Sequence, residues 1–245
     1  HSVVDSMNFG NPEDPVELGK FVESLRAIRD FCQKFSLPVV SGNVSLYNQS
    51  KEQNVKPTPV IFMTGIIEDV RKAIPSFFTG EGNSVYLMGN EDGDLSGSSL
   101  LHHLGYEDTS APFVDLDELS GIRKSMQALI SHGLVLAAHD ISDGGLLNAL
   151  SEMTFGRSIG ISVDISETAG GRPINKLFAE GGNRILIEVP QDKEKTVEGF
   201  VTASIRKLGT TGGDRILVEN MDINIINIKV EDAKNAWSNG LAAMI

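Results

Sequence analysis

The chain is poor in cysteine, with Cys32 as its one thiol among 245 residues. A single thiol cannot form a disulfide within the chain or supply a cysteine-rich zinc cluster, so both kinds of site are excluded. Cys32 falls on the apolar stripe of a predicted helix, where a free thiol behaves as a small buried hydrophobe. Without a disulfide framework, the cytoplasm is the compartment to expect.

Basic residues are also scarce, since 21 Lys and Arg face 33 Asp and Glu, a formal net charge of −12. Binding to nucleic acid needs clustered Lys and Arg that neutralise phosphates, so no nucleic-acid partner is expected. An acidic protein can still bind a nucleotide, because backbone amides and a metal ion can hold its phosphates.

No apolar run reaches the roughly 18 residues that a membrane helix needs, so no membrane partner is expected. The longest runs, residues 59–67 and 134–138, have the length of strands. Residues 1–5 contain no basic segment followed by an apolar one, which argues against a secretory signal. The chain does not begin with Met. Together with the missing domain half described below, this predicts an excised fragment.

Apolar spacing predicts alternating helices and strands. A first helix is expected after Asp14, which can cap it, with Pro15 in its first turn and Glu17 at capping-box spacing. Residues 71–82 are expected to form a connector. Strands are expected at 37–40, 60–67, 84–88, 134–138, 160–165, 184–189, 215–219 and 223–229, and further helices at 97–104, 121–132, after 145, at 192–208 and at 231–238. The alternation predicts an α/β or α+β fold with a mixed sheet.

The first segment that suggests chemistry is residues 140–145, Asp-Ile-Ser-Asp-Gly-Gly, between a predicted strand and helix. Carboxylates suit Mg²⁺, and Gly144 and Gly145 would let phosphate approach the amides of the helix start. The alternative is an aspartate that caps the helix, with turn glycines. His139 is expected to form a hydrogen bond near the strand end and not to bind metal.

A second candidate is residues 41–48, where small and polar side chains follow a predicted strand. Gly42 would allow close backbone approach, and Asn43 and Ser45 offer oxygens to a metal or a phosphate. The alternative is an ordinary polar turn at the end of the strand. Residues 5–12 suggest, by composition, a turn before the first helix.

Taken together, these segments resemble one enzyme family in order and spacing. They read DSMNFGNP at 5–12, SGNVSLYN at 41–48, TPVIFMTGIIED at 58–69 and HDISDGGLL at 139–147, with a weaker match at 178–181. The resemblance is to the small, bacterial-type phosphoribosylformylglycinamidine synthase subunit, PurL. HDISDGG is shared more widely among relatives of aminoimidazole ribonucleotide (AIR) synthetase, whereas the first two segments as a pair are specific.

The resemblance implies the tail of an AIR-synthetase N-type domain at 1–80, followed by a complete C-type domain at 81–245. Both would belong to the second of two tandem units. The absent half would carry the catalytic histidine and the main ATP and Mg²⁺ ligands, so no catalytic residue can be named here. The sequence departs from the family pattern at His1 and at residues 179–183.

The family reaction converts formylglycinamide ribonucleotide, ATP and glutamine-derived ammonia to the amidine, ADP and phosphate. By resemblance, Asp5 and Gly42 bind ATP, Asn43 helps to hold Mg²⁺ and Ser45 contacts the small-molecule substrate. Asp140 matches an aspartate associated with metal and nucleotide. The implied partners are the missing N-terminal half, a glutaminase subunit and a small accessory subunit.

Two other functions remain open at this point. One is a small-molecule kinase on the same scaffold, against which SGNVSLYN argues. The other is a binding module without enzymatic activity, which the isolated chain could be even if it derives from a ligase.

Overall fold

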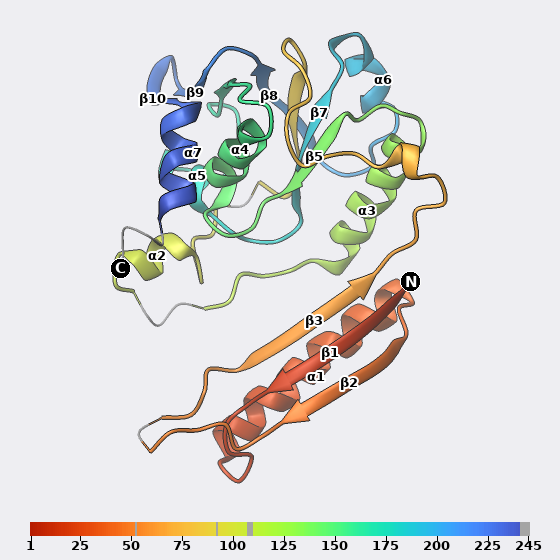
Figure 1. Ribbon diagram of the computed structural model, residues 1–245, viewed down its shortest axis with the longest axis vertical. Coiled ribbons are helices and arrows are strands. Elements are labelled where there is room, and N and C mark those ends of the chain that lie inside the picture. Colours follow the sequence, from red (N-terminus) through yellow and green to blue (C-terminus); the bar gives the residue numbers. More distant parts are fainter. Residues whose placement is uncertain (52, 92, 107–109, 241–245) are drawn as a thin grey trace. The chain divides into compact units, whose positions relative to one another are not determined.

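The computed structural model describes residues 1–51, 53–91, 93–106 and 110–240 (Figure 1). The chain divides into two compact units, His1–Val70 and Arg71–Ile245. No helix in the described part of the chain is both long and apolar enough to cross a membrane.

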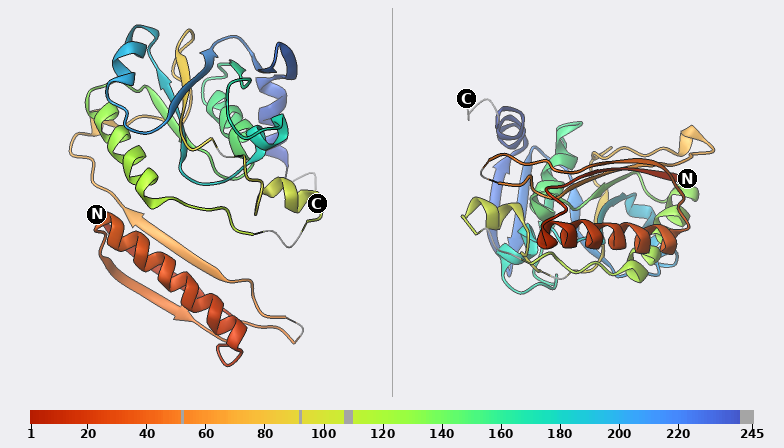
Figure 2. Two further views of the ribbon diagram at one scale, coloured as in Figure 1. Left: turned by 180° about the vertical axis from the view of Figure 1, so that it is seen from behind. Right: turned by 90° about the horizontal axis from the view of Figure 1, so that it is seen from below.

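The first unit is a three-stranded sheet with the order β2-β1-β3. Strand β1 pairs in parallel with β2 and antiparallel with β3, and the parallel connection is made by helix α1. Figure 2 shows α1 running along one face of this sheet. The bounds are β1 Ser2–Asn8, α1 Pro15–Phe35, β2 Val39–Ser45 and β3 Thr58–Thr64.

Helix α1 confirms the predicted start. The Asp14 side chain accepts a hydrogen bond from the Val16 amide at 2.8 Å, and Pro15 occupies the first turn. Phe21 on the helix packs against Phe9, the residue that follows β1, with the two rings edge-on at 5.2 Å. Cys32 is buried, as predicted.

The second unit is built on a seven-stranded sheet with the order β10-β9-β6-β8-β4-β7-β5. Strands β6 and β9 pair in parallel and the other neighbours are antiparallel, so the sheet is mixed. The strands are β4 Ser84–Gly89, β5 Ala137–Asp140, β6 Ile161–Asp164, β7 Arg184–Val189, β8 Ile205–Thr211, β9 Arg215–Asn220 and β10 Ile223–Lys229; the α-helices are α2 Ser99–His103, α3 Leu116–Ser131, α4 Gly145–Phe155, α5 Pro173–Phe178, α6 Glu194–Glu198 and α7 Val230–Asn239; and the 3₁₀ turns are η1 Val70–Lys72 and η2 Gln191–Lys193.

Helices cover both faces of this sheet, which gives three layers. Successive residues of β4 alternate between the two cores, as pleating requires. Val85 and Leu87 pack in the core that α4, α5 and α7 close. Tyr86 and Met88 pack in the core that α3 and α6 close. The predicted α/β (α+β) class with mixed sheets is confirmed.

The prediction of a helix over 192–208 is wrong. The segment forms η2 and the short helix α6, and strand β8 begins at Ile205. The apolar residues of this segment recur at a spacing compatible with a helix. In the structure, β8 lies between β4 and β6 and forms hydrogen bonds to both. The ladder bonds on both sides outweigh the weak local preference.

The turn predicted at 5–12 is also wrong over its first half. Residues 2–8 form β1, the central strand of the first sheet, because both of its edges are hydrogen-bonded. The strand predicted to end at Val40 continues to Ser45 for the same reason, since it pairs with β1 along that length. Helix α5 was not predicted, and the strand expected at 134–138 lies at Ala137–Asp140.

A buried carboxylate fixes the segment that leads into β4. The Glu188 side chain on β7 is fully buried and accepts hydrogen bonds from the Thr79 amide (2.9 Å) and hydroxyl (2.9 Å), the Gly80 amide (3.3 Å) and the Asn83 side-chain amide (2.8 Å). Such a carboxylate is tolerated in the interior because donors replace its lost water.

We expect Glu188→Gln to lower the free energy of unfolding of the second unit by about 3 kcal/mol, because the glutamine amide nitrogen would face donors and several charge-assisted bonds would be lost. Urea unfolding monitored by circular dichroism measures the change. Glu219→Gln, at an exposed position on β9, is the control and should have no effect. An equal loss of stability in both variants would contradict this role for Glu188.

Candidate functional site

Strands β1 and β2 bring two of the predicted residues into contact. Asp5 lies directly beside Gly42 in the parallel register. A Cβ atom added at Gly42 would stand 2.4 Å from Asp5 Oδ1 and 2.9 Å from its Cγ. The Asp5 carboxylate therefore occupies the space that a side chain at position 42 would need, which explains the glycine.

Asn43 and Ser45 lie on the same strand but face the other side of the sheet. Side chains alternate along a strand, and Asn43 and Ser45 pair with Ser6 and Asn8, whereas Gly42 pairs with Asp5. The four predicted residues are thus neighbours in the first unit, divided between two faces. Gly42 and Asn43 lie inside β2 and Ser45 is its last residue, so the expected loop position is wrong.

On the Asp5 side, a shallow groove runs between α1 and the start of β2. Most of its surface is apolar, and Asp5 and Arg29 are its charged members. A hydrogen-bond acceptor beside an apolar wall suits a ring-bearing group that carries N–H or O–H donors. The lining residues are Asp5, Leu25, Ile28, Arg29, Cys32, Gln33, Ser36, Leu37, Pro38 and Val39.

Asp140 belongs to the second unit, at the end of β5, and its side chain is 75% exposed. The preceding His139 is largely buried. Its Nε2 lies 3.1 Å from Glu152 Oε2, and its Nδ1 lies 2.7 Å from the Asp140 carbonyl oxygen. Both ring nitrogens are engaged within the chain, which confirms the expectation of a hydrogen-bonding His139 near the strand end.

The phosphate contact expected at Gly144 and Gly145 is not supported. The Gly144 amide donates to Glu180 Oε1 at 2.8 Å, and the Gly145 amide donates to the Ser142 carbonyl oxygen at 2.9 Å. Gly145 has φ +72°, and an added Cβ would stand 2.6 Å from the carbonyl oxygen of Leu177. Gly145 therefore allows α4 to pack closely against α5, whereas an added Cβ at Gly144 would stand 2.7 Å from the Asn148 Cβ within α4.

Glu180 is a residue whose role the sequence analysis missed. The same carboxylate oxygen that accepts from Gly144 also accepts from the Ser99 amide at 2.8 Å. A carboxylate at the N-termini of both α2 and α4 is stabilised by the positive ends of the two helix dipoles. The sequence-based alternative of a capping aspartate is also wrong, because the N-cap is Gly144 and no side chain of the motif caps it. The weak match at 178–181 was the one signal for Glu180.

Within the described residues, no group of three or more His, Cys, Asp and Glu side chains could hold a metal ion. Asn43 and Asp140 each offer oxygen donors, which are the ligands that Mg²⁺ prefers. Since Mg²⁺ commonly keeps waters and binds phosphate oxygens, one protein oxygen at either place would suffice for a metal that a bound phosphate group also held.

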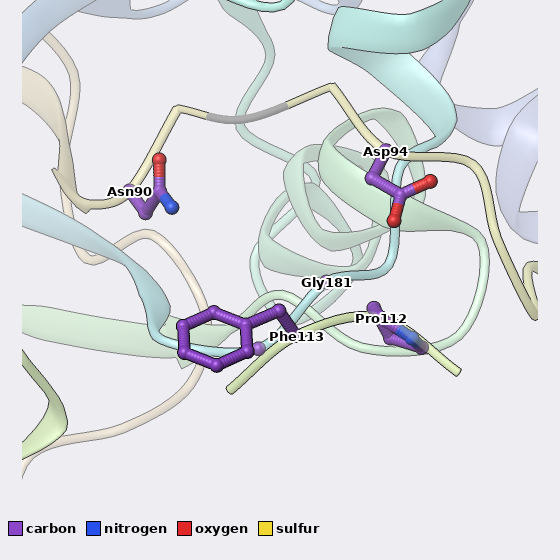
Figure 3. A pocket seen from close by; sticks show the side chains of 6 residues that line it. Asn90, Asp94, Pro112, Phe113 and Gly181 are labelled. Atoms are coloured by element: carbon purple, nitrogen blue, oxygen red, sulfur yellow. The ribbon is translucent and has the colours of Figure 1, made fainter. Parts of the chain in front are cut away.

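The second unit also contains a small pocket of about 50 Å³ (Figure 3). Hydrogen bonds from the Ser96 backbone amide and then its hydroxyl hold the pKa of Asp94 below its usual value. The ionised carboxylate at the rim disfavours phosphate, and none of the predicted site residues lines the pocket. Its lining consists of Asn90, Asp94, Pro112, Phe113, Gly181 and Gly182.

Two family models match the chain. Residues 1–67 match the N-terminal domain of AIR synthase related proteins, and residues 80–232 match the C-terminal domain of the same proteins. The second match alone spans more than half of the chain.

Curated relatives share the sequence over nearly its whole length. The chain is 48% identical over 242 residues to phosphoribosylformylglycinamidine synthase subunit PurL of Thermoplasma acidophilum, which covers 98% of the chain and 32% of the relative. It is 43% identical to the same subunit of Thermoplasma volcanium, covering 100% and 32%. The resemblance inferred from the motifs is confirmed, and the chain spans about a third of the length of these relatives.

Solved structures share the fold. Thermotoga maritima PurL complexed with FGAR superimposes with a TM-score of 0.72 at 16% identity, covering 95% of this chain and 39% of that one. The same protein complexed with ATP gives a TM-score of 0.69 at 14% identity, covering 95% and 37%. The HypE–HypF complex gives 0.64 at 11% identity, covering 93% and 77%.

We expect Gly42→Ala to turn the Asp5 side chain away from its present position, because the new methyl group and the carboxylate cannot both fit. Since a side chain can rotate where backbone cannot, the cost in unfolding free energy should stay near 1 kcal/mol. A crystal structure of the variant and a thermal melt test this. Gly65→Ala, with no atom within 4 Å of the added Cβ, is the control. An unmoved Asp5 carboxylate would show that the contact does not constrain position 42.

Proposed function

The chain belongs to the family of AIR synthase related proteins, and from that premise we propose that it is the C-terminal portion of a phosphoribosylformylglycinamidine synthase of the PurL type. The observation that carries the proposal is the contact of Asp5 with Gly42, which joins two motifs that lie far apart in the sequence. Similarity to curated PurL subunits over nearly the whole of this chain supports it.

Residues 1–80 are proposed to be the tail of an N-type domain, and residues 81–245 a complete C-type domain. The two family matches, at 1–67 and 80–232, support this order of domains, and the compact units divide ten residues earlier, after Val70. The partners proposed are the N-terminal half of the same polypeptide, a glutaminase subunit and a small accessory subunit.

In the proposed reaction, the amide oxygen of formylglycinamide ribonucleotide attacks the γ-phosphorus of ATP, and ADP leaves. Ammonia then adds to the carbon of the resulting iminophosphate. The C–O bond to the phosphorylated oxygen breaks, inorganic phosphate leaves and a proton is lost from nitrogen, which gives the amidine. When bound, Mg²⁺ neutralises the charge of the phosphates.

This chain's residues would bind and orient the reactants. Asp5 would accept hydrogen bonds from ATP, and Gly42 would leave room for the Asp5 carboxylate. Asn43 would offer an oxygen to Mg²⁺, and Ser45 would contact the ribonucleotide from the same face of the sheet. Asp140 is proposed as a further metal contact, which its exposure at the end of β5 permits.

The test is ADP release by the intact protein and by this chain alone. We expect the intact protein to release ADP only when both formylglycinamide ribonucleotide and ammonium are present. The chain alone should be inactive, because positioned acids or bases contribute roughly 10²–10⁴-fold and the phosphate ligands more. Release that does not depend on ammonium would favour a small-molecule kinase. Full activity of the chain alone would overturn its assignment as a portion of the enzyme.

Asn43→Ala and Ser45→Ala, made in the intact protein, should impair catalysis more than folding. Each change removes one charge-assisted or metal contact, which is worth about 1.5–3 kcal/mol, or roughly 10- to 150-fold in kcat/KM. Steady-state kinetics and thermal melts measure the two effects. A large drop in melting temperature with unchanged activity per folded molecule would make both residues structural.

A further inference from the structure

The Ser45 hydroxyl is held by one neighbouring side chain. Its Oγ lies 3.2 Å from Asn48 Oδ1 and 3.1 Å from Asn48 Nδ2. The same amide nitrogen donates to the Ser45 carbonyl oxygen at 2.9 Å. Asn48 therefore contacts both the backbone and the side chain of Ser45, the residue that is proposed to bind the substrate.

Asn48 is itself fixed against the end of β1. Its backbone amide donates to the Phe9 carbonyl oxygen at 3.1 Å, and its side chain donates to the same oxygen at 3.2 Å. Its carbonyl oxygen accepts from the Val55 amide at 2.9 Å. An asparagine held at both backbone and side chain cannot change rotamer without breaking several hydrogen bonds.

The corner before Asn48 is also constrained. Tyr47 has φ +58°, a left-handed conformation that is rare for a bulky side chain. Its amide donates to the Gly10 carbonyl oxygen at 2.9 Å. Strained backbone persists where surrounding contacts determine it, and such places cluster at functional sites.

We propose that Asn48 is a positioning residue that sets the rotamer of Ser45, so that the Ser45 hydroxyl faces the ribonucleotide. This inference rests on the function proposed above and names the residue through which the two motifs at 5–12 and 41–48 act together. Asn48 acts on the substrate through Ser45, because the contacts described above join it to Ser45 and to the end of β1.

A double-mutant cycle in the intact protein tests the coupling. Asn48→Ala and Ser45→Ala should each raise KM for the ribonucleotide about tenfold and leave KM for ATP unchanged, as expected for loss of one hydrogen bond. The double variant should resemble Ser45→Ala within about twofold, since a residue that acts only through Ser45 has nothing further to lose.

Asn54→Ala is the matched control. The Asn54 side-chain oxygen accepts a hydrogen bond from the Asn11 amide, in the motif at 5–12, at 3.4 Å. In the described structure Asn54 makes no hydrogen bond to Ser45. Its effect on KM should be small and should add to that of Ser45→Ala. If Asn48→Ala does not fold, Asn48→Asp replaces it, because aspartate keeps the shape and loses the amide donors.

The outcomes separate the two proposals. If Ser45→Ala raises KM and the Asn48 effect adds to it in full, the positioning role is overturned while the proposed function stands. If Ser45→Ala leaves KM unchanged, the substrate contact proposed for Ser45 fails, and the inference fails with it. In the chain without ligand, the Asn48 side-chain amide signals in an NMR spectrum should shift in Ser45→Ala, and signals that do not move would refute the hydrogen bond itself.

Discussion

The hydrogen bonding of β1 on both of its edges is the constraint on which the first unit depends. It pairs with β2 in parallel and with β3 antiparallel, and α1 is the crossover that the parallel pair requires. The register places Asp5 beside Gly42. A slip of one residue would turn every side chain of a strand to the opposite face, so Asp5 would no longer meet the glycine that leaves room for it. The geometry of the candidate site is therefore set by backbone pairing before any side chain contributes.

In the second unit, carboxylates tie separate segments together. Glu188 holds the segment before β4, and Glu180 joins the starts of α2 and α4. Glu152 lies against His139 on β5 and accepts from the Trp237 side chain on α7 at 3.0 Å. Part of the acidic composition thus has a structural use, because backbone amides and polar side chains take the place of water around these groups. The sequence predicted a phosphate site at the start of α4, but the Glu180 carboxylate accepts the hydrogen bond from the Gly144 amide there.

The sequence predicted those elements whose local signals agree with their tertiary setting. Helix α1 has its cap, its proline and its apolar face in one segment, and the strands at 184–189 and 223–229 have the predicted bounds. Prediction from the sequence failed for segments whose secondary structure is determined by pairing with other strands. Strand β1 contains Asp5 and Asn8, which are residue types depleted in strands, and the apolar residues of β8 follow a spacing that is also compatible with a helix. The role of Glu180 could not be predicted, because its donors lie 36 and 81 residues away in the chain.

The sequence motifs identified residues of the candidate site, but they could not predict on which face of the sheet each side chain lies. Four polar or small residues in two loops could converge on one ligand, whereas the same residues on paired strands are separated by the pleat. Asp5 and Gly42 face the α1 side, and Asn43 and Ser45 face the other. Strand β2 lies at the edge of the sheet order β2-β1-β3. Under the proposed function, ATP at Asp5 and the ribonucleotide at Ser45 lie on opposite faces of these strands, and Ser45 is the last residue of β2. In that function the corner from Ser45 to Asn48 would orient the ribonucleotide, because Ser45 is the residue proposed to contact it and Asn48 holds the Ser45 hydroxyl.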